Sequence, residues 1–448
     1  MVKKRTVIII ICTVSAAIVL AGLGVLIWWL VTRDDSYSVT QLSGRGIGYS
    51  RYTAALTTIH EVGDMFWWFY PTLAASGTSR PLILWLDGVT GVPPSLSANL
   101  GMFGPYDLTF TKRNNSWVEQ YNLLFIDAPL GTGFSTPLSK DHIPKTIEEN
   151  AEHLATTLKS FYSVHSSYRN APLYIFGQGS GAQLAVAMAI ELQNHRRLNP
   201  RGVVIANGII SPALAMTKLG FYLEELGYIA DNGRPAIEAL ASETSALVSS
   251  GDYRNAFDKF ASLGEFVNEN AGAVAVNLGH IVEKKTNDSS ASRDYFGQYE
   301  YLRQVSNSDL DIMNVVVAHA LGMPTNVTYD AGREDVIDIF KSTFMIPATE
   351  KIEYLLQNTD VSVSIYNGNL DAVSNTPGQL EWVENLRWPG QEEFKNRPRQ
   401  TLIVNSLLEG YFRETPRLKF YWMNAAGQSV PIDSPSAINV VLRRITET

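Results

Sequence analysis

The chain has 448 residues, 45% of them hydrophobic, which is enough for a large buried core. Its formal net charge is −8 and no Lys/Arg block lies outside the extreme N-terminus, so nucleic-acid binding has little support. No group of acidic, His or Cys residues has the spacing of a metal site, and no bound cofactor is implied.

The N-terminal residues predict a membrane anchor. A short tail, residues 1–5 (MVKKR), precedes an uncharged apolar run at 6–32, which as a helix is longer than a hydrocarbon core of ~30 Å. A cleaved signal peptide, the alternative, usually has an apolar run of only about 7–15 residues. Positive charge before the run outweighs Arg33 after it. We therefore expect a single-pass type II protein of the secretory pathway, lysosome or cell surface, with its main domain lumenal or extracellular.

Glycosylation signals agree with that location. Sequons begin at Asn114, Asn287 and Asn326. The single cysteine, Cys12, lies inside the apolar run, so the domain after it has no disulfide. Residues 33–45 are polar and predict a linker between the anchor and a domain at 46–448.

Strand-like runs recur in this domain, and many of them are continuously apolar, as expected for strands that are covered on both faces. They are Met65–Phe69, Leu82–Leu86, Leu123–Ile126, Leu173–Phe176, Val203–Ala206, Val361–Tyr366 and Leu418–Trp422, with helices at Ile147–Tyr162 and Gly181–Gln193 between some of them. The alternation predicts an α/β fold with a mostly parallel central sheet. From about 213 to 345 the strand signal fades, which predicts a helical insertion of the kind that often forms a lid.

The stretch PLYIFGQGSGAQLAV, residues 172–186, has the form of the strand-turn-helix elbow of serine hydrolases. Crowding at such an elbow requires small residues two positions before and after the nucleophile. Ser180 would be preceded by the bulky Gln178, whereas Gly179 is flanked by Gly177 and Gly181. The pattern therefore predicts glycine at the tip. Two alternatives are a strand one residue longer, which would bring Ser180 to the tip, and an ordinary glycine-rich turn. A nucleotide-binding turn is excluded, because GQGSG lacks both the GxGxxG spacing and a P-loop lysine.

The histidines bear on the same question. In this architecture the catalytic residues follow the order nucleophile, acid, histidine. The best acid candidate is Asp371 in YNGNLD, and none of the 7 histidines follows it. Without an imidazole base a serine hydroxyl is a poor nucleophile. His280 and His319 fall in or near the insertion, where a structural or surface role is favoured.

Across 46–448 these motifs resemble the serine carboxypeptidases, α/β-hydrolase peptidases that include cathepsin A and the vitellogenic-like carboxypeptidases. The segments that carry the resemblance are PLILWLDGVTG, NLLFIDAPLGTGFS, FGQGSGAQ, GVVIANGIISP, IYNGNLD and AAGQSVPIDSPSAI. The resemblance places the family's nucleophile on Gly179 and its histidine on Gln428, and it retains the aspartate as Asp371. It implies that the oxyanion donors are the backbone N–H groups of Val89 and Ser180.

The same resemblance assigns the group that binds a substrate's terminal carboxylate to Asp87, Met102 and Gln178, beside Trp85. An ionised Asp87 would repel a carboxylate, and Met102 offers it no useful hydrogen bond. The family's protonated glutamates have no counterpart here.

We therefore expect a catalytically inactive, membrane-anchored protein that acts by binding a peptide or protein partner. A purely structural form of this hypothesis is a scaffold that binds no ligand in its pocket. The alternative is an active carboxypeptidase or other hydrolase that uses Ser180 with Asp371. The resemblance is compatible with a homodimer, although no residue pattern shows an interface.

Overall fold

The computed structural model describes residues 36–48, 51–88, 92–195, 198–271, 276–283, 307–331 and 333–447. In this part of the chain one 12-stranded sheet has the order β1-β2-β3-β5-β4-β7-β8-β9-β12-β11-β10, with β6 paired to β3. The strands are β1 Tyr37–Gln41, β2 Thr53–Ile59, β3 Gly63–Tyr70, β4 Leu82–Leu86, β5 Asn122–Ile126, β6 Thr136–Pro137, β7 Leu173–Gln178, β8 Gly202–Ala206, β9 Ser362–Gly368, β10 Gln400–Val404, β11 Leu407–Glu414 and β12 Leu418–Met423.

The sheet is parallel at its centre and antiparallel at its flanks. Strands β5, β4, β7, β8, β9 and β12 run parallel. In contrast, β2, β3 and β5 pair antiparallel, as do β10, β11 and β12. The prediction of a mostly parallel sheet is right for the centre and wrong for the flanks, so the sheet is mixed. Short connections cause the difference, because a link such as Asn405-Ser406, with φ of 51° and 65°, can join only antiparallel neighbours.

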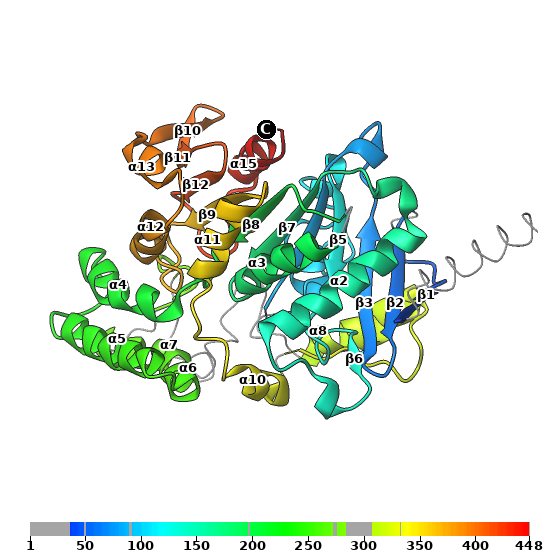
Figure 1. Ribbon diagram of the computed structural model, residues 1–448, viewed down its shortest axis with the longest axis horizontal. Coiled ribbons are helices and arrows are strands. Elements are labelled where there is room, and N and C mark those ends of the chain that lie inside the picture. Colours follow the sequence, from blue (N-terminus) through cyan, green and yellow to red (C-terminus); the bar gives the residue numbers. More distant parts are fainter. Residues whose placement is uncertain are drawn as a thin grey trace, which may run out of the picture. The chain divides into compact units, whose positions relative to one another are not determined.

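Helices cover both faces of the parallel centre. On one face α2 (Ile147–Val164) and α3 (Gly181–Glu191) lie side by side across the strands (Figure 1), and α11 (Thr349–Asn358) packs beside α3. On the other face lie the π-helical segment Ser95–Phe103 and α15 (Pro435–Thr446). Because both faces are covered, every residue of β4, LILWL, is buried.

Helices also make up most of the described chain between β8 and α11. They are α4 Pro212–Glu225, α5 Gly233–Ser249, α6 Tyr253–Ala261, α7 Leu263–Ala271, α8 Asn307–Asp311, the π-helical segment Ile312–Val317, α9 Ala318–Leu321 and α10 Glu334–Phe340. Helices α4 to α6 share a core of their own that includes Met216, Leu223, Ile237 and Phe257. Figure 1 shows α4 and α5 side by side outside the sheet, below α12. This separate core accounts for the buried apolar residues of the helices in this part of the chain.

The remaining helices lie after β9 and are short except for α15. They are α12 Thr376–Asn385, α13 Gln391–Asn396 and α14 Val430–Asp433, and single 3-10 turns occur at Gly77–Ser79, Trp117–Glu119, Lys140–His142, Ser166–Tyr168 and Leu192–Asn194.

The N-terminal predictions fall mostly beyond the described residues. The predicted anchor, 6–32, lies outside them, and no helix inside them is long and apolar enough to cross a bilayer. Strand β1 lies within the stretch that was predicted to be a linker, so part of that stretch is ordered as a strand.

Candidate functional site

The glycine-rich stretch forms a sharp strand-turn-helix connection. Strand β7 ends at Gln178 and α3 begins at Gly181. Between them Gly179 has a φ of +54°, a region that L side chains rarely adopt. Its N–H donates to the Ala206 carbonyl at 3.2 Å, and its own carbonyl accepts from the Ile209 N–H at 2.9 Å. Gly179 is therefore the tip of the turn, fixed to the end of β8.

The flanking glycines are enclosed by backbone on both sides. A Cβ on Gly177 would lie 2.3 Å from the Gly181 carbonyl oxygen, and a Cβ on Gly181 would lie 2.5 Å from the Leu86 carbonyl oxygen. These distances are far below van der Waals contact. The crowding that the sequence pattern predicts around a tip at Gly179 is present.

Ser180 lies one residue beyond the tip and is the N-cap residue of α3. Its φ of −67° and ψ of −20° are helical, and its side chain is buried. A Cβ on Gly88 would come within 1.7 Å of the Ser180 Oγ, so this hydroxyl lies against the backbone that follows β4. Ser180 also lines a small cavity with Ile147, Phe340 and Phe344.

Asp371 follows β9 and is fully buried. Its Oδ1 accepts from the N–H groups of Val373 (2.8 Å) and Ser374 (3.2 Å), while its Oδ2 accepts from the Ser374 Oγ (2.5 Å) and the Asn207 Nδ2 (2.9 Å). Burial nevertheless raises the pKa of Asp371 to about 6, because desolvation of the charged form outweighs these four donors. Both carboxyl oxygens are thus held by neighbours on the same loop and on the end of β8.

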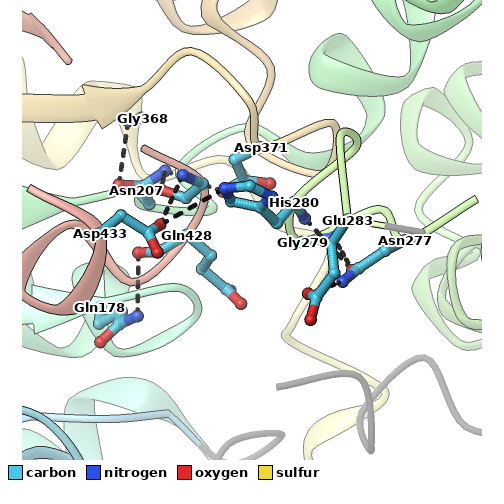
Figure 2. Close-up of polar contacts among 11 residues, drawn as sticks. Gln178, Asn207, Asn277, Gly279, His280, Glu283, Gly368, Asp371, Gln428 and Asp433 are labelled. Carbon is cyan, nitrogen blue, oxygen red and sulfur yellow. Dashed lines mark hydrogen bonds and ion pairs between the residues drawn. The ribbon is translucent and has the colours of Figure 1, made fainter. Parts of the chain in front are cut away.

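Asn207 links Asp371 to the loop that carries Gln428 (Figure 2). Its Nδ2 also lies 3.4 Å from the Gly427 carbonyl. Gln428 is buried, and its backbone carbonyl accepts a hydrogen bond from the Gln178 Nε2 at 3.2 Å. Gln178, Asp371 and Gln428, which are far apart in the sequence, therefore meet at the carboxyl ends of the parallel strands, where α/β proteins bind their ligands.

His280 also lies in this region. Its position there was not predicted from the sequence. Its segment, Val276–Glu283, bonds to both loops: the Ala372 N–H donates to the Leu278 carbonyl at 2.7 Å, and the Gln428 N–H donates to the Gly279 carbonyl at 2.9 Å. The His280 Nε2 is 3.9 Å from the Asp433 Oδ2, and Figure 2 shows the ring directed toward that carboxylate. No local motif marks His280, because the contact depends on how the insertion folds back.

The residues assigned to the carboxylate-binding group lie on adjacent strand ends. Asp87 follows β4, and the pairing of Leu86 with Gly177 places it beside Gln178. The Asp87 Oδ2 accepts from the Ser97 Oγ at 2.5 Å and from the Trp85 Nε1 at 3.3 Å. Burial raises the pKa of Asp87 to about 7. Met102 is buried in the neighbouring apolar cluster, which Trp85 joins.

Some predicted sites are not described. Val89, the expected oxyanion donor, and Asn287, one expected glycosylation site, lie outside the described residues. Asn114 and Asn326 are exposed, as glycan attachment requires.

A comparison with protein-family models matches residues 48–448 to the serine carboxypeptidase family, peptidase S10. The chain belongs to this family. It is 29% identical over 410 residues to the retinoid-inducible serine carboxypeptidase of Rattus norvegicus, covering 87% of this chain and 90% of that protein. It is also 29% identical over 420 residues to serine carboxypeptidase-like 51 of Arabidopsis thaliana, covering 87% and 91%.

A solved relative supports the fold. The structure of a prohormone-processing carboxypeptidase from Saccharomyces cerevisiae matches with a TM-score of 0.70 at 20% identity, covering 86% of this chain and 87% of that one. The α/β-hydrolase-like fold expected from the resemblance is confirmed.

Proposed function

We propose that this serine carboxypeptidase-like protein binds a peptide or protein partner without cleaving it. The observation that carries the proposal is Gly179 at the tip of the β7–α3 turn, with φ of +54° and with Gly177 and Gly181 enclosed on either side. A hydrolase of this architecture carries its nucleophilic hydroxyl at that tip. Glycine has no side chain with which to attack an acyl carbon.

The groups around the tip support the same proposal. Gln428 has a neutral amide that cannot accept a proton near neutral pH as an imidazole does. Asp371 finds four hydrogen-bond donors in Asn207, Val373 and Ser374, so its carboxylate is held in place without a histidine. The retained aspartate is thus explained by packing of its own loop.

An active hydrolase that uses Ser180 has less support. The Ser180 hydroxyl lies against Gly88 and lines a cavity with Phe340 and Phe344. The four donors to Asp371 come from three other residues. A Ser180–Asp371 pair would therefore need both groups to leave their present surroundings.

The location of the protein is part of the proposal. The apolar run at 6–32 would anchor the chain with the domain on the lumenal or extracellular side, where Asn114, Asn287 and Asn326 could carry glycans. A homodimer is compatible with this arrangement.

Turnover of a blocked dipeptide tests the proposal. The full chain, in detergent, would be assayed at pH 5 and pH 7 beside its Ser180→Ala variant, with an active family member as a positive control. We expect no turnover above background from either protein. Turnover by the wild type that disappears in Ser180→Ala would overturn the proposal and assign the nucleophile to Ser180.

A further inference from the structure

A cleft lies at the amino ends of the parallel strands, opposite the end that carries Gly179. Its lining includes Tyr174 near the start of β7, Ser362 at the start of β9 and Lys419 near the start of β12. A strand rises about 3.3 Å per residue, so Tyr174 and Gln178 are about 13 Å apart along β7. This amino-end cleft has a volume of about 710 Å³, which is within the range of about 300–1,000 Å³ that is usual for ligand pockets. It can therefore admit a small molecule away from the candidate functional site.

The lining of the amino-end cleft carries an excess of positive charge. Its charged residues are Arg201, Arg397, Arg417, Lys419, Asp360 and Glu414. Two of them have ion-pair partners outside the lining: the Arg397 Nη2 lies 2.5 Å from the Glu393 Oε1, and the Glu414 Oε2 lies 2.5 Å from the Arg444 Nη2. With these partners included, five cations accompany three carboxylates. The excess favours an anionic ligand.

Backbone carbonyl groups hold two of these cations in place. The Arg417 Nη2 donates to the Leu355 and Val361 carbonyls, both at 3.0 Å, and the Lys419 Nζ donates to the Arg444 carbonyl at 2.9 Å. A carbonyl group orients a cation without neutralising its charge. Burial lowers the pKa of both side chains, because desolvation of the charged forms outweighs the carboxylates near them. An anion in the cleft would supply the missing negative charge.

The shape and charge of the lining indicate which anion fits. A phosphate monoester brings about two negative charges and three acceptor oxygens, whereas a carboxylate brings one charge. Guanidinium groups bind such oxyanions through paired N–H donors. Asp360 and Gln400 are exposed polar residues of the same lining and can bond to hydroxyl groups. Tyr174, the aromatic residue of the lining, is 1% exposed and offers no face on which a nucleobase could stack.

We propose that the amino-end cleft binds a sugar phosphate. Arg201, Arg417 and Lys419 bind the phosphate group, and Asp360 and Gln400 bind the hydroxyl groups of the sugar. Inorganic phosphate offers the same anion but leaves most of the cleft unfilled and brings no sugar hydroxyl groups to Asp360. The site is separate from the β7–α3 turn, so this inference does not depend on whether that turn is catalytic.

Calorimetric titration of the full chain in detergent at pH 7 tests the inference with four compounds. They are glucose 6-phosphate, inorganic phosphate, glucuronate and glucose. We expect glucose 6-phosphate to bind at least about 10-fold more tightly than each of the other three. Equal or tighter binding of any of these three, or no binding of glucose 6-phosphate, would overturn the inference.

Variants of the cationic residues test the phosphate contacts. Arg201→Gln, at an exposed position, and Lys419→Met should each weaken the binding of glucose 6-phosphate at least about 10-fold. Arg254→Gln is the control, because it removes the same charge on α6, outside the lining, and should leave the affinity unchanged. Unchanged affinity in folded Arg201→Gln and Lys419→Met would contradict the assignment of the phosphate to these residues.

Asp360→Ala separates the sugar contacts from the phosphate contacts. This variant loses an acceptor for hydroxyl groups and one negative charge. The preference for glucose 6-phosphate over inorganic phosphate should therefore disappear, while inorganic phosphate binds at least as tightly as it does to the wild type. A preserved preference, or weaker binding of inorganic phosphate, would contradict the role given to Asp360.

Discussion

Single glycines fix the geometry of the candidate site. Gly177 and Gly181 allow β7, β4 and α3 to approach so closely that a methyl group on either would overlap backbone atoms. Backbone cannot rotate away as a flexible side chain can. The glycines therefore preserve the family's turn whether or not the tip carries a nucleophile.

Gly181→Ala should destabilise the protein through this contact. Its new methyl group would lie 2.5 Å from the Leu86 carbonyl oxygen, and overpacking of this kind typically costs about 1–3 kcal/mol. Urea unfolding measures the change in the free energy of unfolding. Gly77→Ala is the control, since its methyl group would meet nothing closer than 3.4 Å. Equal stability of the two variants would contradict the crowding argument.

At the scale of elements, the segment Val276–Glu283 connects the helical region to the loops of Asp371 and Gln428. Its carbonyl groups at Leu278 and Gly279 accept from the N–H groups of Ala372 and Gln428. The absence of a side chain at Gly427 permits this packing, because a Cβ there would lie 2.3 Å from the Gly279 carbonyl oxygen and 2.7 Å from the His280 Cδ2.

Gly427→Ala should displace this segment without unfolding the sheet. We expect hydrogen exchange at the amides of Ile281, Ala372 and Gln428 to become at least about 10-fold faster, which corresponds to about 1.4 kcal/mol of local stability. Exchange within β7 should not change. The neighbouring Ala425→Ser, at an exposed position, serves as the control. Unaltered protection in Gly427→Ala would show that the segment is not held through this contact.

The sequence predicts the central elements better than the flanks. Strand β4 has the predicted bounds, and β5, β7, β8 and β12 differ from theirs by two residues or fewer, because their mainly apolar runs match burial on both faces. Strands β10 and β11 were not predicted, since residues such as Ile403 and Leu407 are exposed and the runs are interrupted by polar residues.

In the candidate site, too, some features could be predicted from the sequence and others could not. The glycine tip could be predicted because crowding in a turn depends on residues close in sequence. The approach of His280 to Asp433 joins an insertion to the C-terminal region, and no local pattern encodes such a contact. Outside this site, the amino-end cleft likewise depends on the register of strands that are far apart in the sequence.

For the whole molecule, buried carboxyl groups should make stability depend on pH. Burial raises the pKa of Asp87 to about 7 and those of Asp127 and Asp371 to about 6, from an ordinary value of 3.8. The folded chain therefore holds these protons more tightly than the unfolded chain. The resulting stabilisation is complete below pH 4 and is lost as pH rises through 6 and 7. His165, whose pKa burial lowers to about 4, acts in the opposite direction.

Comparison with Asp87→Asn isolates one of these groups. Between pH 5 and pH 8 the wild type should lose about 1–3 kcal/mol of unfolding free energy relative to the variant. Urea unfolding across this range gives the difference, and Asp107→Asn provides the control for a lost surface charge. A difference that stays constant with pH would mean that Asp87 is ionised throughout.

Labelling with a fluorophosphonate, followed by intact-protein and peptide mass spectrometry, tests the central claim most directly. The wild-type chain should remain unlabelled, whereas the double variant Gly179→Ser/Gln428→His, which places a hydroxyl at the tip and an imidazole on the facing loop, should be labelled at position 179. Labelling of the wild type at Ser180, or a folded double variant that stays unlabelled, would contradict the assignment of Gly179 to the nucleophile position.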